Sequence, residues 1–360
     1  MAVLAVGLAF LVGDSLAACG TSSRPPHPRS SPHIISSPTA TPSPLPSPSI
    51  GTTSCRLPLY GSGLSSPGAG SPAGGFLQLP GGSVSPAAGT SLTEVAGTWQ
   101  TTGSPHLTGD EDEESWDSQL SRWLPASPAE ISPSGTQYAY AAGAPGQVQV
   151  HLVTPASGAD NVLIGESNYQ VLGWQGEQIL LVASASSGSG TEGLYLLNPG
   201  TGAVRELQPQ ISTVSWYLAG EGAVWGVGVN AADPSPPPTG SGDELLRYDE
   251  ATGALTTWSY QPGLSILPVG VTGAGDPVEV VEGTSQTLVQ LATAPAAATR
   301  LLQGAGLDSL MPLEVTSSFS DARGTWLSTD SGLYLLTPQS QLLLEQTGNF
   351  ANAEVVGPCG

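Results

Sequence analysis

Residues 194–202 read Leu194-Tyr195-Leu196-Leu197-Asn198-Pro199-Gly200-Thr201-Gly202. The apolar run at the start is typical of a buried β-strand, and the Asn-Pro-Gly segment after it is typical of a tight turn. A second short segment with strand character follows at residues 203–207. The stretch therefore predicts two antiparallel strands joined by a turn.

The same strand–turn pattern occurs five times along the chain. Its turns end at residues 158, 202, 253, 296 and 340, so the successive steps are 44, 51, 43 and 44 residues. Repeats of about 40–45 residues with four strands each are typical of the blades of a β-propeller. The longest step contains a Pro-rich loop at residues 230–244. In the second repeat we predict strands at residues 169–174, 178–183, 193–197 and 203–207.

The first repeat contains the segment Ile131-Ser132-Pro133-Ser134-Gly135-Thr136-Gln137-Tyr138-Ala139-Tyr140. It resembles the S-P-D-G turn of TolB-like and related WD40-like propellers, with Ser134 at the position where Asp is usual. The resemblance covers the chain from about residue 55 to the end. It implies an all-β propeller and carries almost no information about function.

The five repeats span residues 122–347 and leave segments with strand character at both ends of the chain. Residues 56–60 and 76–84 would supply three strands, and residues 351–356 would supply the innermost one. Together they would form a sixth blade, which leaves no open sheet edge in the ring. We therefore predict an all-β, six-bladed β-propeller closed by a blade built from both termini.

Three cysteines are placed at informative positions. Cys55 precedes the first strand of the folded region and Cys359 is the penultimate residue. A disulfide between them would stand where the other blades have a hairpin turn, closing a loop of 304 residues. Chain entropy gives such a bond up to about 5–6 kcal/mol of stabilisation in an oxidising compartment. The alternative is two unpaired thiols at frayed ends.

The third cysteine follows an apolar N-terminal segment. Residues 1–12 are apolar and too short to span a bilayer, which favours a signal peptide. The segment Leu16-Ala17-Ala18-Cys19-Gly20 resembles the lipobox of bacterial lipoproteins, which implies cleavage before Cys19 and acylation of its thiol. No basic residue precedes the apolar run and Asp14 interrupts it, so we expect the true start to lie upstream.

A competing interpretation concerns Gly13-Asp14-Ser15-Leu16, which resembles the nucleophile block of GDSL-type esterases, with Ser15 as the nucleophile. That family pairs the serine with a late Asp-x-x-His. None of the four histidines here stands three residues after an Asp, and a serine without a base is a poor nucleophile. The lipobox is the favoured interpretation.

Composition divides the chain into three parts. Residues 1–18 are the predicted signal peptide, and residues 19–54 are the lipidated cysteine and a tether rich in Pro, Ser and Thr. Such a tether cannot bury enough apolar surface to fold and would extend to about 110 Å. Residues 55–360 are the predicted propeller. The net charge of −21, with no lysine, excludes nucleic acid as a plausible partner.

Three long loops, at residues 61–75, 88–121 and 230–244, would rise from one rim of the propeller, where loops on a rigid scaffold favour recognition. The candidate binding rim comprises Asp110, Glu111, Asp112, Glu113, Glu114, Trp116 and Asp243. A solvated acidic loop is the favoured interpretation of the carboxylate run, and a Ca²⁺ site at Asp110, Asp112 and Glu114 is the alternative. We expect no cofactor. His151 lies in a strand and is expected to be half-buried.

These features predict a non-enzymatic binding scaffold, anchored by lipid to the outer face of the bacterial cell membrane or to the outer membrane. Its partner would be an envelope or extracellular protein or glycan, bound by a monomeric propeller. One alternative is a propeller enzyme of hydrolase or lyase type, with its active site in the central channel. Another is a sensor or assembly subunit that works with an inner-membrane partner.

Overall fold

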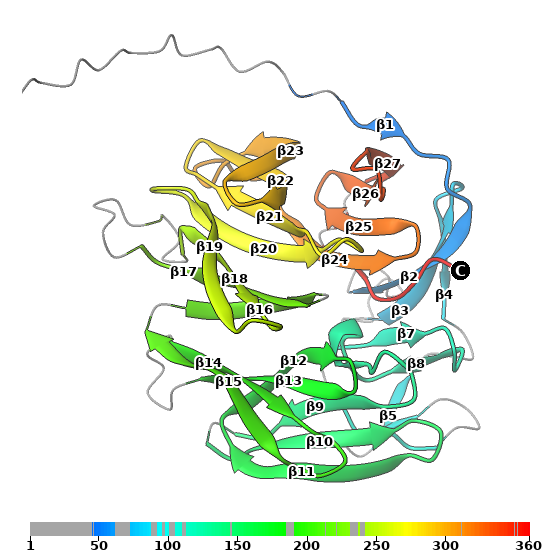
Figure 1. The fold of residues 1–360 in the computed structure, drawn as a ribbon. Coiled ribbons are helices and arrows are strands. Elements are labelled where there is room, and N and C mark those ends of the chain that lie inside the picture. Colours follow the sequence, from blue (N-terminus) through cyan, green and yellow to red (C-terminus); the bar gives the residue numbers. More distant parts are fainter. Residues whose placement is uncertain are drawn as a thin grey trace, which may run out of the picture. The chain divides into compact units, whose positions relative to one another are not determined.

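The computed structural model describes residues 45, 47–61, 73–87, 92–95, 98–100, 105–109, 113–144, 146–184, 191–212, 214–220, 222–230, 237, 242–310, 312–348, 350 and 352–360. This part of the chain is almost entirely β-structure (Figure 1), with one 3-10 turn at Pro128–Glu130. The helical content is too small to include a segment that could span a membrane.

Three four-stranded antiparallel sheets follow one another along the chain, each in the order of its strands. Sheet II contains β12 (Tyr169–Gln175), β13 (Gln178–Ser184), β14 (Thr191–Leu197) and β15 (Val204–Ser212). Sheet III contains β16 (Val214–Gly220), β17 (Ala223–Gly228), β18 (Glu244–Asp249) and β19 (Ala254–Tyr260). Sheet IV contains β20 (Ser265–Val271), β21 (Pro277–Glu282), β22 (Gln286–Ala294) and β23 (Ala297–Ala305). The four strands predicted in the second repeat are confirmed.

Sheet V repeats this order with β24 (Val315–Asp321), β25 (Gly324–Thr329), β26 (Gly332–Leu336) and β27 (Leu342–Thr347). A fifth strand, β1 (Ser49–Ile50), pairs in parallel with β27. This strand lies inside the segment predicted as tether. Thr53 then donates its backbone N–H (3.1 Å) and its hydroxyl (2.5 Å) to the carboxylate of Glu345, a buried residue on β27. The chain is thus fastened to sheet V before it enters the next sheet.

Sheet VI combines the two ends of the folded region. It contains β28 (Glu354–Val355), β2 (Cys55–Gly61), β3 (Ala73–Leu79) and β4 (Ser83–Pro86), in that order. β28 is held to β2 by two residue pairs, Leu59 with Val355 and Tyr60 with Glu354. The expectation that residues from both termini share one sheet is met by this arrangement.

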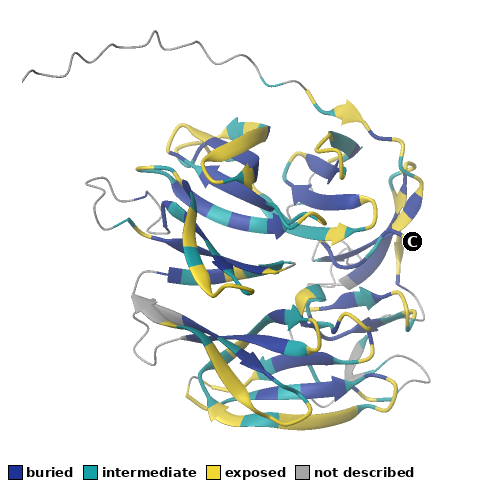
Figure 2. Cartoon of the chain, viewed as in Figure 1, coloured by how far each residue is buried: buried dark blue, intermediate teal, exposed yellow. Residues whose placement is uncertain are grey.

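Sheets II to VI contact one another in order through their innermost strands, and sheet I joins this series through β9 (Tyr138–Ala142). β9 contacts β12, and the contacts continue from β12 to β16, β20, β24 and β28. The apolar cores lie between neighbouring sheets, as where Trp326 of sheet V packs among Leu57 and Leu59 of sheet VI. Figure 2 shows the burial concentrated on the middle strands of the sheets, such as β17 and β25, whereas the outer strands β19 and β11 (Ala159–Ser167) are largely exposed. The sequence pattern of apolar middle strands follows from this packing.

Sheet I differs from the predicted four-stranded repeat. It pairs only β9, β10 (Val148–Thr154) and β11, with an isolated bridge from Ile131 to Tyr138 in the first-strand position. Prolines explain the loss, because Pro125, Pro128 and Pro133 cannot donate to a ladder. Trp123, at the start of this repeat, lies in a separate hairpin of β7 (Ser115–Asp117) and β8 (Arg122–Leu124). A further small hairpin joins β5 (Thr93–Val95) and β6 (Thr98–Gln100).

Candidate functional site

The structure describes only part of the acidic run on the expected rim. Asp110, Glu111 and Asp112 lie outside the described residues. Glu113 is exposed, but Glu114 is buried, and burial raises its pKa to about 7. Glu114 therefore differs from the expectation of a solvated acidic loop. Within the described part of the chain, no group of three His, Cys, Asp or Glu residues could hold a metal ion.

Asp243 occupies a structural position at the rim. Its side chain is fully buried, and one carboxylate oxygen accepts the backbone N–H of Asn230 at 2.8 Å. Its backbone carbonyl accepts the N–H of Gln261 at 2.9 Å. Asp243 thus joins the end of the loop after β17 to the connection between sheets III and IV. A carboxylate in this position orders the rim and does not face solvent.

Trp116 also lies away from an open rim. Its half-buried ring forms an edge contact with Phe76 (4.9 Å between centroids) and lies 5.7 Å from Trp123. Its backbone N–H donates to Val356 at 2.9 Å, which joins β7 to the residues that follow β28. Trp116 therefore belongs to the contact between the β7–β8 hairpin and sheet VI, and the same hairpin packs on sheet I through Leu124. The hairpin thus forms the seam between sheets I and VI.

The innermost strands of the described sheets carry little acid–base chemistry. β12, β16, β20, β24 and β28 contain two carboxylates, Asp321 and Glu354, and no histidine. Asp321 accepts the indole N–H of Trp326 and the backbone N–H of Cys359, both at 3.0 Å. One carboxylate is thus committed to holding the chain end, and general acid–base catalysis needs positioned groups that are free to exchange protons.

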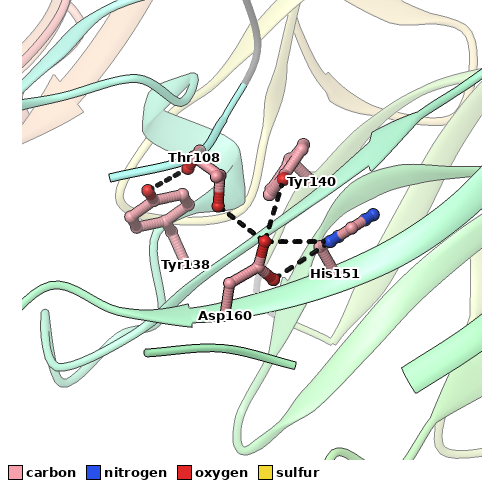
Figure 3. Close-up of polar contacts among 5 residues, drawn as sticks. All are labelled: Thr108, Tyr138, Tyr140, His151 and Asp160. Carbon is pink, nitrogen blue, oxygen red and sulfur yellow. Dashed lines mark hydrogen bonds and ion pairs between the residues drawn. The ribbon is translucent and has the colours of Figure 1, made fainter. Parts of the chain in front are cut away.

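The described residues do bring together one polar cluster that includes a histidine (Figure 3). His151 on β10 lies with its Nδ1 3.0 Å from Asp160 of β11, and its ring stacks on Tyr140 of β9 at 4.7 Å. Asp160 also accepts the hydroxyl of Thr108 at 2.7 Å and that of Tyr140 at 3.4 Å. The Tyr138 hydroxyl donates to the Thr108 carbonyl. Burial raises the pKa of Tyr140 to about 12 and also raises that of Tyr138.

This cluster fastens part of the long connection between β4 and β7 onto sheet I. Thr108 is the only member from that connection, and its neighbour Leu107 is buried among Leu124, Tyr138 and Val153. His151 and Asp160 resemble the base and orienting carboxylate of a hydrolytic triad, but no interaction joins them to a serine or cysteine among the described residues. The pairing was not predicted from the sequence, where His151 had no visible partner. His151 and Asp160 are diagonal neighbours on adjacent antiparallel strands. A correct prediction of the strand register would therefore have placed the two side chains together.

The two remaining cysteines form a disulfide at the end of sheet VI. The Cα atoms of Cys55 and Cys359 are 5.6 Å apart. The guanidinium of Arg323 donates to the Cys359 carbonyl, and the backbones of Arg56 and Gly360 exchange hydrogen bonds of 2.8 and 3.1 Å. Cys19 lies outside the described residues. The disulfide thus takes the place of the covalent turn between the first and second strands of the other sheets.

No family model matches the chain, and no curated protein is similar to it in sequence. Solved structures similar to it include TolB from Acinetobacter baumannii, with 12% identity over 85% of this chain and 67% of that one, and a TM-score of 0.44. A putative TolB from Agrobacterium tumefaciens has 10% identity over 71% of this chain and 91% of that one, with a TM-score of 0.40. An acylaminoacyl peptidase from Pyrococcus horikoshii has 10% identity over 76% of this chain and 44% of that one, with a TM-score of 0.45. The neighbours of this all-β chain are thus TolB-like propellers and propeller-containing peptidases.

Proposed function

We propose that this chain is a lipid-anchored, extracytoplasmic binding scaffold whose folded region is a closed six-bladed β-propeller. The observation that carries the proposal is sheet VI, which is assembled from both termini and fastened by the Cys55–Cys359 disulfide. A disulfide of this kind persists in an oxidising compartment. The hydrogen bond from Trp116 to Val356 supports closure of the ring between sheets VI and I.

The binding surface we propose is the rim that carries the long connections. In each sheet, the loop between the second and third strands and the loop to the next sheet leave from the same end. Three large apolar side chains are exposed on these connections: Val229 after β17, Tyr260 at the end of β19, and Leu310 between β23 and β24. Exposed apolar groups on loops of a rigid scaffold suit a protein or glycan partner.

An enzymatic role is the second candidate. The inner strands would need ionisable side chains that converge, yet their two carboxylates include Asp321, which already accepts hydrogen bonds from three donors. The His151–Asp160 pair lies on β10 and on the outer strand β11, away from the first strands. These positions favour binding over catalysis at the centre of the ring.

Substituting Cys19 by alanine tests the anchor. We expect Cys19→Ala to shift the protein from the membrane fraction to the soluble extracytoplasmic fraction, because the thiol is the proposed acylation site and a single peripheral contact cannot replace two or three acyl chains. The measurement is immunoblotting of fractions after a carbonate wash. Ser22→Ala, three residues downstream, is the matched control and should remain membrane-bound. Retention of Cys19→Ala in the washed membranes would contradict the lipid anchor.

The rim is tested by site-specific photo-crosslinking in cells. A photoreactive residue at position 310 should give a discrete crosslinked product, because Leu310 is fully exposed on the proposed binding face. The same residue at position 204, exposed at the outer edge of sheet II, is the control and should not give that product. Identical products from both positions, or none from position 310, would argue against the rim as the binding surface.

A further inference from the structure

A cavity of about 170 Å³ opens at the seam between sheets I and VI. Its walls include Trp116, Asp117, Gln119, Ile131, Gly135 and Phe319. It lies at the disulfide end of the sheets, because Val356, Gly357 and Pro358 lead from β28 to Cys359 and also line it. The cavity is thus on the face opposite the proposed binding rim. A single water needs only about 10–15 Å³ of such space, so a larger group fits.

One wall of the cavity carries a carboxylate with an unused oxygen. Asp117 is 5% exposed, and its Oδ1 accepts the backbone N–H groups of Gln119 (2.7 Å) and Leu120 (3.0 Å). Its Oδ2 is buried and has no hydrogen-bond partner. The cross-strand neighbour Arg122 interacts electrostatically with Asp117, but no hydrogen bond joins the two side chains. Its Nη1 donates to the carbonyl of Pro155 at 3.1 Å, and its Nε and Nη2 are buried without a hydrogen-bond partner. A buried carboxylate oxygen without a donor is costly, so this position favours a donor from outside the chain.

Access to that oxygen passes Gly135 and Gln119. A Cβ atom on Gly135 would lie 3.1 Å from Oδ2 of Asp117 and 3.0 Å from the side-chain amide carbon of Gln119. The gap between Gly135 and the carboxylate is therefore narrower than a methyl group needs, so a ligand reaches Oδ2 only when the Gln119 side chain moves. The Gln119 residue is exposed, so its side chain can rotate aside without losing core packing. A ligand group can then reach Oδ2 from the cavity.

The remaining surroundings favour a positive charge with an apolar stem. The rings of Trp116 and Phe319 and the side chain of Ile131 line the same cavity, and cations lie favourably against aromatic faces. The net charge of −21 raises the local concentration of cations around the protein. Low solvent access strengthens the attraction between a bound cation and Asp117.

We propose that this cavity binds an alkylguanidinium or alkylammonium group, with the cation on Oδ2 of Asp117 and the alkyl stem against Trp116 and Phe319. A second cavity of about 260 Å³ adjoins the first at Trp116, Ser118 and Pro358. It is also lined by Arg56, which is exposed and lies 3.8 Å over the ring of Phe76. Arg56 offers donors to a carbonyl or carboxylate oxygen of the same ligand. The pair of cavities suits a basic side chain together with its flanking backbone, or a free small cation.

The proposal is tested by isothermal titration of the full chain with propylguanidinium and with propylurea, its neutral counterpart. We expect saturable binding of propylguanidinium and at least about tenfold weaker binding of propylurea. The reason is that the free energy of a hydrogen bond to a charged group exceeds that of a neutral one by about the amount that corresponds to a tenfold change in affinity. Asp117→Asn should weaken propylguanidinium binding by a similar factor. Asp160→Asn, which neutralises a carboxylate in the His151 cluster, is the matched control and should bind as the wild type does.

Two further measurements distinguish a basic peptide side chain from a free cation and control for misfolding of the variant. If acetyl-Gly-Arg-Gly-amide binds more tightly than propylguanidinium, the site serves a basic side chain of a polypeptide; equal affinity indicates a free cation. Should Asp117→Asn unfold, Phe319→Leu removes one aromatic wall and should weaken binding several-fold with the carboxylate in place. Binding that is absent for both cations, or equal for propylguanidinium and propylurea, would overturn the proposal.

Discussion

Replacing Cys55 and Cys359 together by serine should lower the free energy of unfolding of the folded region by about 2–5 kcal/mol. The disulfide spans 304 residues and covalently joins the two ends that form sheet VI. The chain-entropy model gives about 5–6 kcal/mol for a loop of that length, and losses of native disulfides fall below this limit. The double substitution avoids leaving a single reactive thiol.

The effect is expected to be large because β28 has a short ladder, and its other hydrogen bonds, such as those of Val356 with Pro58 and Trp116, all involve the short segment 352–360. Its ladder consists of the pairs Leu59–Val355 and Tyr60–Glu354. Hydrogen bonds from Arg323 to the Cys359 carbonyl and from the Cys359 N–H to Asp321 remain, but they fix the same short segment. Without the disulfide, detachment of residues 352–360 would expose the core around Leu59 and Trp326.

The measurement is urea denaturation of the full chain, with hydrogen exchange of the Val355 amide as a local probe. Cys19→Ser is the control, because it removes the one cysteine that is not in the disulfide and should keep the wild-type midpoint. Val355 should exchange faster in the double variant even where the molecule remains folded. A midpoint that matches the wild type would mean that the termini are held together by packing alone.

The sheets could be predicted from the sequence because their signals are local. In sheet II, the turn at Asn198 and Gly202 and the apolar strands on either side define a hairpin within a few residues of chain. Because the same hairpin pattern recurs every 43–51 residues, the positions of the later sheets could be predicted as well. The assignment of Cys55 and Cys359 to one sheet followed from counting the strands left over at the two ends.

The seam between sheets I and VI could not be predicted in the same way. Glu114 lies in a run of acidic residues that looks solvated, yet it is buried beside the β7–β8 hairpin. The bond from Thr108 to Asp160 joins residues 52 positions apart, and that from Thr53 to Glu345 joins residues 292 positions apart. Such contacts depend on how irregular segments pack, and no periodic pattern in the sequence encodes them.

Unfolding free energy should fall as the pH is raised from about 5 to 8. Glu279 on β21 is fully buried, bonded to the hydroxyl of Ser259 at 3.0 Å and to the amide of Gln290 at 3.3 Å. Burial raises its pKa to about 7, well above the ordinary value of 4.5. The folded chain therefore holds this proton more tightly than the unfolded chain. The resulting stabilisation is complete below about pH 4.5 and is lost as the pH rises through 7. Glu114 and Glu250 shift in the same direction, each to about 7 because of burial.

Glu279→Gln isolates this contribution from the repulsion among the other charges of an acidic chain. A glutamine accepts from one neighbour and donates to the other, so both hydrogen bonds survive while the titrating proton is removed. At pH 8 the variant should exceed the wild type in unfolding free energy by up to about 3 kcal/mol, since each pKa unit corresponds to about 1.4 kcal/mol. At pH 5 the two should be nearly equal. Glu177→Gln, at an exposed turn position between β12 and β13, removes the same formal charge and should keep the wild-type pH profile. Urea titrations at both pH values measure the difference. A Glu279→Gln variant whose stability falls with pH as steeply as that of the wild type would show that this carboxyl is not the buried acid responsible.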